Sequence, residues 1–132
     1  MLFYAATDAA SLDTPSYKEF GEKSLGLPRR DVEWFLEQYT PDPKDRLDAR
    51  ASPLLAEDLR GVALALVVTA EFDVLRDEAE EYARRLEEAG VPVKLMRCNG
   101  MIHGFLSMAG LIHRATGYFE QVVEEIRGMA SA

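Results

Sequence analysis

The sequence predicts an α/β protein in which about three parallel strands are flanked by helices. Short, continuous apolar runs alternate along the chain with segments whose apolar residues recur at helical spacing. Strands that alternate with helices form βαβ units, whose strands lie parallel and are joined by right-handed crossovers. With 132 residues, 48% of them hydrophobic and 29% charged, the chain has the composition of one globular domain or part of one.

The first third of the chain begins with a predicted strand and ends with a predicted helix. Leu2–Ala6 is a short apolar run, which is typical of a strand buried on both faces. Residues 11–27 are rich in polar residues and glycine, which predicts a loop or a short irregular helix. Pro28 suits the first turn of a helix that ends before Pro41. One apolar stripe of this helix has the spacing i, i+3, i+4, i+7: Val32, Phe35, Leu36 and Tyr39.

The central part contains the clearest predicted strand and the helix that follows it. Val62–Thr69 is apolar and rich in β-branched residues, so we expect a strand inside a parallel sheet. Asp77 suits the N-cap of the next helix, because Glu80 follows three residues later as in a capping box. Gly90 marks the end of this helix. Its expected buried stripe consists of Ala79, Tyr82, Ala83 and Leu86.

The last part predicts one more strand and one more helix. Val91–Arg97 has the composition of a strand, and Asn99 with Gly100 predicts a turn after it. Ala115–Met129 predicts a final amphipathic helix. We expect His113, just before that helix, to be a surface or packing residue.

Composition excludes several classes of function. The formal net charge is −8 and the basic residues are interleaved with acids, so a nucleic-acid partner is not expected. The longest apolar run, Val62–Ala70, is far shorter than the ~20 residues of a membrane-spanning helix. Cys98 is the single cysteine, which excludes an internal disulfide and suits a reducing cytoplasm. One cysteine and two histidines make a transition-metal site improbable, since structural zinc usually takes four such ligands.

Two predicted loops carry the residues with catalytic chemistry. In open parallel sheets, ligands bind beyond the carboxyl ends of the strands. The loop 71–77 contains Asp73 and the loop 98–105 contains His103. An acid that accepts a hydrogen bond from an imidazole fixes its tautomer, so that the imidazole can act as general base and acid. The alternatives are that Asp73 is a helix cap or solvated turn residue and that His103 is a plain loop residue.

Three stretches support a particular family, namely ASPLL at 51–55, TAEFDVLRDE at 69–78 and GMIHGF at 100–105. In order and spacing they resemble the hormone-sensitive-lipase branch of the carboxylesterases with the α/β-hydrolase fold, of which the chain resembles the C-terminal half. The resemblance implies that Asp73 is the acid and His103 the base of a catalytic triad. It also implies a small acyl ester as substrate, and neither a metal nor an organic cofactor. The chain departs from the family at Val74, where proline is common, and at Cys98, where an aromatic is common.

The resemblance also implies how the chain is organised. Residues 1–132 would be a partial α/β-hydrolase domain, with Leu2–Asp8 as the strand that follows the nucleophile helix of the family. Residues 11–40 would be a cap-like insertion that helps to cover the acyl pocket. Residues 62–132 would be the C-terminal strands and helices that carry the acid and the histidine.

The family's nucleophile motif, G-x-S-x-G, does not occur in this sequence. The nearest stretch is Gly21–Gly26, which has one residue too many before Ser24, and we interpret Ser24 as a loop residue. The HGGG-type oxyanion segment is absent too. Cys98 is a conceivable substitute nucleophile, but a lone cysteine at a strand end is more often a small core residue.

We therefore expect these 132 residues to be inactive by themselves, with the serine and the oxyanion donors supplied by a preceding portion. The alternative is a catalytically inactive remnant that serves as a binding or oligomerisation module. In both cases the apolar strands predict an exposed sheet edge, and such edges promote homo-oligomers or aggregation.

Overall fold

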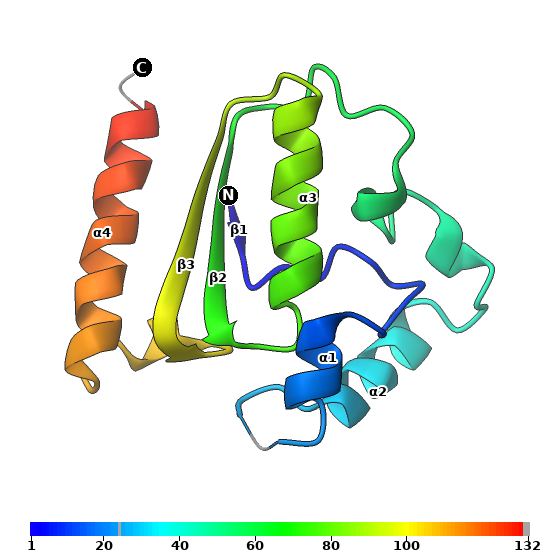
Figure 1. Ribbon diagram of the computed structural model, residues 1–132, viewed down its shortest axis with the longest axis horizontal. Helices are drawn as coiled ribbons and strands as arrows, with labels where there is room; N and C mark the ends of the chain where they lie inside the picture. Colours follow the sequence, from blue (N-terminus) through cyan, green and yellow to red (C-terminus); the bar gives the residue numbers. More distant parts are fainter. Residues whose placement is uncertain (24, 131–132) are drawn as a thin grey trace.

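The computed structural model describes residues 1–23 and 25–130. Within them, a parallel sheet of strand order β1-β2-β3 lies between one helix, α3, on one face and another, α4, on the other (Figure 1). These elements are β1 (Leu2–Phe3), β2 (Ala65–Phe72), α3 (Arg76–Glu88), β3 (Val93–Ile102) and α4 (His113–Ala130). The predicted α/β class with three parallel strands is confirmed.

The central strand, β2, is buried on both faces, as its continuous apolar sequence predicts. Successive side chains of a strand point to opposite faces of the sheet. Ala65 and Val67 accordingly pack against α3, whereas Leu66, Val68 and Ala70 pack in the cluster that contains α4. The sheet is therefore the middle layer of two hydrophobic cores.

The bounds of all three strands differ from the sequence prediction, and β1 ends at Phe3 and not at Ala6. Val62–Leu64 is exposed and lies outside the strand, and β2 continues instead to Phe72. The third strand extends to Ile102, so that the Asn99-Gly100 pair lies within β3 and not in a turn after it. The register explains this, because Ala70 pairs with Cys98 and Phe72 pairs with Ile102. Two steps along β2 thus match four along β3, and the asparagine–glycine signal marks a bulge.

The buried stripe of α3 is as predicted, but the start of the helix is not. Ala79, Tyr82, Ala83 and Leu86 are all buried. The helix begins at Arg76, and the residue at its N-cap makes no capping hydrogen bond through its side chain. Asp77 lies in the first turn, where its Oδ2 accepts the amide N–H of Ser16 at 2.7 Å. Glu80 binds Thr69 and Arg97, so the predicted capping box is wrong.

Two helices lie near the carboxyl ends of β2 and β3, namely α1 (Pro15–Phe20) and α2 (Arg29–Tyr39) (Figure 1). Thr14 caps α1 by accepting the amide N–H of Tyr17. The bounds of α2 agree closely with the prediction, but only half of its apolar stripe is buried. Val32 and Leu36 are buried, whereas the side chains of Phe35 and Tyr39 are mostly exposed. Three short 3₁₀ turns complete the fold: Asp45–Leu47, Pro53–Leu55 and Phe105–Met108.

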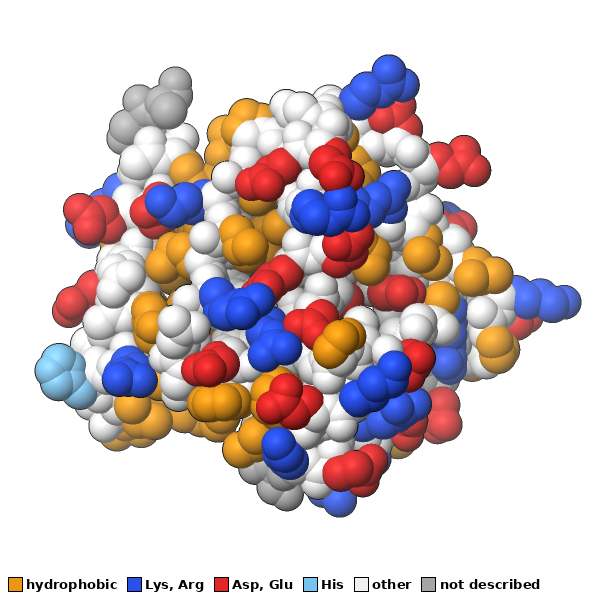
Figure 2. All heavy atoms as spheres, in the orientation of Figure 1, with side chains coloured by type: hydrophobic (Ala, Val, Ile, Leu, Met, Phe, Trp, Pro, Cys, Tyr) orange, Lys and Arg blue, Asp and Glu red, His pale blue; other side chains and the backbone are white. Residues whose placement is uncertain are grey.

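The surface carries no large field of one sign on the face seen in Figure 2, where basic and acidic side chains are interspersed. None of the helices in residues 1–23 and 25–130 combines the length and the apolarity needed to cross a membrane. The outer strands β1 and β3 expose Phe3 and Leu95. Association through the sheet edge stays a prediction.

Candidate active site

Asp73 and His103 lie side by side because of the register of the sheet. Phe72 and Ile102 are paired at the ends of β2 and β3, so the next residue of each strand leaves the sheet at the same point. Asp73 Oδ2 lies 2.9 Å from His103 Nδ1. The sequence placed these two residues on separate loops, and the structure brings them into hydrogen-bond distance.

The two partners of this hydrogen bond differ in exposure. The side chain of Asp73 is 1% exposed, whereas that of His103 is 26% exposed. Asp73 Oδ1 accepts the amide N–H of Leu75 at 3.1 Å, which holds the carboxylate within its own loop. In the tautomer with the proton on Nδ1, the Nδ1–H group donates this hydrogen bond to the Asp73 carboxylate, and Nε2 keeps its lone pair. This is the arrangement in which an imidazole acts as general base.

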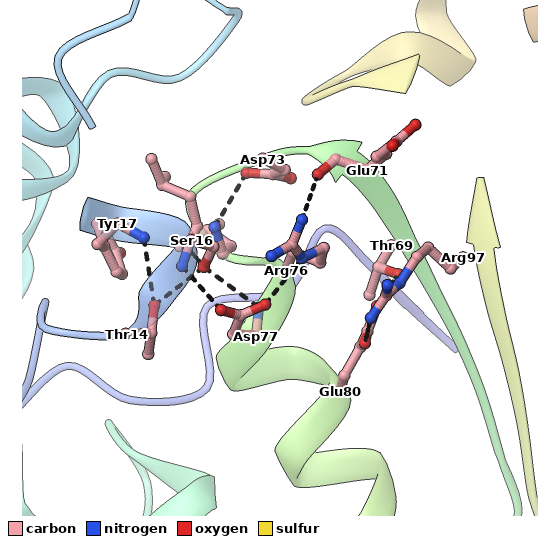
Figure 3. Close-up of polar contacts among 12 residues, drawn as sticks. Thr14, Ser16, Tyr17, Thr69, Glu71, Asp73, Arg76, Asp77, Glu80 and Arg97 are labelled. Atoms are coloured by element: carbon pink, nitrogen blue, oxygen red, sulfur yellow. Dashed lines mark hydrogen bonds and ion pairs between the residues drawn. The ribbon is translucent and has the colours of Figure 1, made fainter. Parts of the chain in front are cut away.

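Ser16 links α1 to the loop that carries Asp73 (Figure 3). Its hydroxyl donates to the carbonyl oxygen of Val74 at 2.6 Å, and its amide N–H donates to Asp77 Oδ2. The side chain of Ser16 is completely buried. The sequence signal Thr14-Pro15 is typical of a helix start, but it cannot reveal partners 58 and 61 positions away.

Arg76 joins the same region from the other side. Its guanidinium donates to the carbonyl oxygen of Glu71 and to Asp77 Oδ1, both at 2.8 Å (Figure 3). It also lies 5.4 Å from the centre of the Phe20 ring, which is a cation–π distance. The end of β2, the first turn of α3 and α1 are therefore held together around the acid loop.

The segment after α1 lies against His103. Gly26 has φ +91°, and a Cβ built at this position would lie 2.9 Å from the carbonyl oxygen of His103. Only glycine combines this backbone conformation with so close an approach. The sequence marked residues 11–27 as loop or irregular helix, but it did not indicate this contact.

An apolar cavity of about 210 Å³ lies beside the acid loop. Leu75, two residues after Asp73, forms part of its wall, Ala6 after β1 forms another part, and the rest comes from residues 27–39 in and before α2. An apolar acyl or alcohol group fits such a lining better than a charged one. The lining residues are Ala6, Leu27, Val32, Phe35, Leu36, Tyr39 and Leu75.

The other candidates from the sequence lie apart from this chemistry. Cys98 is fully buried in the core between the sheet and α4, and burial raises the pKa of its thiol to about 11. It therefore has neither the access nor the thiolate character of a nucleophile. His113 is exposed at the start of α4, and Ser24 lies outside the described residues. Among residues 1–23 and 25–130, no group of three or more His, Cys, Asp or Glu side chains is arranged to hold a metal ion.

Comparison with known proteins places this geometry in a family. The family model for the alpha/beta hydrolase fold matches residues 1–107. The chain therefore belongs to the α/β-hydrolase family, and its homologues there are carboxylesterases of the hormone-sensitive-lipase type.

Two curated relatives illustrate the similarity. The ethyl acetate hydrolase of Pseudomonas putida is 41% identical over 127 residues, which are 96% of this chain and 39% of the relative. The carboxylic ester hydrolase LipN of Mycobacterium tuberculosis is 40% identical over 98% of this chain and 34% of its own length. The chain thus spans between a third and two-fifths of the length of these two relatives.

Solved structures agree with the fold. The hyperthermophilic esterase from Pyrobaculum calidifontis has a TM-score of 0.90 and 37% identity, covering 98% of this chain and 42% of the esterase. A thermostable esterase from Pseudomonas putida has a TM-score of 0.83 and 45% identity, covering 90% and 38% respectively. The three strands and their helices therefore match part of larger esterases.

Proposed function

We propose that this chain is the part of a serine carboxylesterase that carries the acid and the base, and that the whole enzyme cleaves small acyl esters. The observation that carries the proposal is the hydrogen bond between the buried Asp73 and the partly exposed His103. The relatives, which include an ethyl acetate hydrolase, support an ester as the substrate class.

In this mechanism His103 moves protons and Asp73 controls its state. A serine from outside these 132 residues attacks the ester carbonyl, and Nε2 of His103 takes the hydroxyl proton. Asp73 holds the proton on Nδ1 and stabilises the imidazolium that forms. Nε2 then protonates the departing alcohol, and a water molecule completes the cycle with the same base. The oxyanion donors also come from outside this segment, and the loss of one such donor typically costs ~10²–10³ in rate.

Residues 11–40 would act in this enzyme as a cap over the acyl group. They include α1, which is bonded to the acid loop, and α2, which lines the apolar cavity. The apolar lining of this cavity suits an apolar acyl or alcohol group.

The test is a chimaera in which residues 1–132 replace the equivalent C-terminal part of the Pseudomonas putida esterase. The chimaera is expected to hydrolyse a short-chain nitrophenyl ester. His103→Ala should reduce kcat by about 10⁶-fold, and Asp73→Asn by about 10⁴-fold, with the fold retained. His113→Ala is the matched control, because His113 is exposed at the start of α4 and should leave kcat unchanged.

A folded chimaera whose turnover survives His103→Ala would contradict the assignment. The 132 residues alone are expected to give neither turnover nor labelling by a fluorophosphonate. Labelling of the purified chain alone would show that it holds a nucleophile of its own. A chimaera that folds, retains the serine and still lacks activity would favour the alternative of a non-catalytic binding or oligomerisation module.

A further inference from the structure

Tyr4 has a backbone conformation that is unusual for its residue type. Among the described residues, Tyr4 is the one non-glycine residue with a positive φ, at +48°. A left-handed conformation costs an L-residue roughly 1–2 kcal/mol, and such strain is concentrated at functional sites. The residue follows β1 directly, and its amide N–H still donates to the carbonyl oxygen of Val68 at 3.0 Å.

The left-handed backbone determines which face of the sheet receives the tyrosine ring. In a regular strand, residues i and i+2 point to the same face. Leu2 packs against the core on the α3 side, but Tyr4 packs in the cluster on the α4 side. The positive φ therefore breaks the alternation and brings the ring to the side of the sheet where His103 and Phe105 lie.

Tyr4 makes three contacts with the short segment that carries the base. Its ring lies 5.1 Å from the imidazole of His103, tilted by 52°. It lies 5.4 Å from the Phe105 ring in an edge-to-face arrangement. Its hydroxyl oxygen accepts the amide N–H of Leu106 at 2.8 Å. Burial raises the pKa of the Tyr4 hydroxyl to about 12, so the acceptor is a neutral phenol at every pH at which an esterase would be assayed.

We propose that Tyr4 is a positioning residue for the base. Its ring closes one face of the imidazole, and its hydroxyl fixes the turn that follows His103. Together they keep Nδ1 on Asp73, so that Nε2 stays free to accept a proton. This inference rests on the proposed function, because a positioned base matters only where His103 moves protons.

Tyr118 is a matched control for a purely structural role. Its ring packs against Phe105 at 5.9 Å, and its hydroxyl donates to the carbonyl oxygen of Asn99 at 3.3 Å. Both tyrosines are partly buried in the same cluster. Among the described residues, the imidazole of His103 has a ring contact with Tyr4 and not with Tyr118. Loss of Tyr118 therefore disturbs the same core without touching the imidazole.

The test is NMR of the chimaera labelled with ¹⁵N-histidine and ¹⁵N-leucine, in which the His103 signals are identified as those that disappear in His103→Ala. Tyr4→Leu should increase exchange of the His103 Nδ1 proton with water about tenfold and populate the other tautomer, because the ring contact and the hydroxyl bond are both lost. Tyr4→Phe keeps the ring and should raise only the exchange of the Leu106 amide, by about fivefold. Tyr118→Leu should leave the His103 tautomer as in the parent chain.

Asp73→Asn separates the failure of this inference from that of the proposed function. If Asp73→Asn leaves the exchange of the His103 Nδ1 proton with water unchanged, the acid–base pair is absent in solution. The proposed function and the role of Tyr4 then both fail. Only the role of Tyr4 is overturned if Asp73→Asn changes the exchange of the His103 Nδ1 proton but Tyr4→Leu does not. The same holds if Tyr118→Leu changes that exchange as much as Tyr4→Leu does. Should Tyr4→Leu fail to fold, unchanged exchange of the Leu106 amide in Tyr4→Phe would overturn the role of the hydroxyl.

Discussion

Glu71 Oε2 accepts the amide N–H of Gly100 at 2.6 Å, which joins the end of β2 to the bulge of β3. The bulge adds residues between Cys98 and Ile102, so it sets where β3 ends and where His103 leaves the sheet. Gly100 has φ +78°, and a Cβ there would collide with the guanidinium of Arg114. The position of the base thus depends on a carboxylate that takes no part in the proposed proton transfer.

Replacement of Glu71 by alanine should destabilise the bulge. The loss of a charged acceptor costs about 1.5–3 kcal/mol, and the Gly100 amide should then exchange with solvent faster. Glu71→Gln keeps a hydrogen-bond acceptor for the Gly100 amide and should therefore lower the free energy of unfolding less than Glu71→Ala does. Urea unfolding and amide exchange measure both effects, with the exposed Glu87→Ala on α3 as the control. Unchanged exchange at Gly100 in Glu71→Ala would show that the bulge holds without this bond.

Ser16→Ala should weaken the link between α1 and the acid loop. The buried carbonyl of Val74 loses its donor, which costs about 1–3 kcal/mol in the free energy of unfolding. Ser11→Ala, at an exposed position before the same helix, should change this free energy by less than about 0.5 kcal/mol. Equal values for the two variants in urea titrations would exclude a role for the Ser16 hydroxyl in holding the loop.

Gly26→Ala should lower the free energy of unfolding more than Gly90→Ala does, although both glycines have a left-handed backbone conformation. Their φ angles are +91° and +80°, so backbone strain of roughly 1–2 kcal/mol applies to each. A Cβ at Gly90 meets nothing within 4 Å, whereas one at Gly26 meets the backbone of His103. The difference between the two unfolding free energies therefore measures the contact with His103. Equal decreases in the unfolding free energy of the two variants would show that the contact with His103 adds no cost to Gly26→Ala.

Glu78 should make the stability depend on pH. The side chain of Glu78 is 1% exposed. Burial raises the pKa of its carboxyl group from 4.5 to about 7, although hydrogen bonds from the amide N–H groups of Thr7 and Asp8 lower it. The nearby Asp8 and Asp73 carboxylates raise it further. The folded state therefore binds more protons than the unfolded state between pH 4.5 and about 7.

Stability contributed by protonated Glu78 is therefore present at low pH and is lost as the pH rises through this window. The full loss is on the order of 3 kcal/mol. Glu78→Gln keeps the acceptor for Thr7 and Asp8 but cannot ionise, so it should not show this loss. Unfolding free energies of both proteins, measured on either side of the window, give the difference. Parallel pH profiles would mean that Glu78 titrates normally in the folded chain.

The proximity of Asp73 and His103 could be predicted from sequence, because each lies in a loop after one of two predicted neighbouring parallel strands. Their roles as acid and base were predicted from the family resemblance. Tyr4, Ser16 and Glu71 could not, since their partners are 102, 58 and 29 positions away and no local pattern specifies them. The asparagine–glycine pair was predicted to form a turn after the strand, but both residues lie within β3 at the bulge. Whether such a signal makes a turn or a bulge is decided by the pairing with β2.

Helix capping shows the same limit. Asp77 and Glu80 have the spacing of a capping box, but tertiary partners take both carboxylates: Ser16 in one case, Thr69 and Arg97 in the other. The exposed Phe35 and Tyr39 on α2 are a further case, because periodicity predicts a stripe but not what covers it.

One βαβ unit, β2-α3-β3, supplies both Asp73 and His103, which are only 30 positions apart. Loop closure over so short a span has a small entropic cost, and contacts of low sequence separation form early in folding. The acid and the base are therefore expected to meet before β1 brings Tyr4 from a far larger separation. Pulsed hydrogen exchange should then protect the amides of β2 and β3 before that of Leu106. In this order of folding, Asp73 and His103 come together when β2-α3-β3 forms as one folding unit. The remaining elements then pack around an acid–base pair that has already formed.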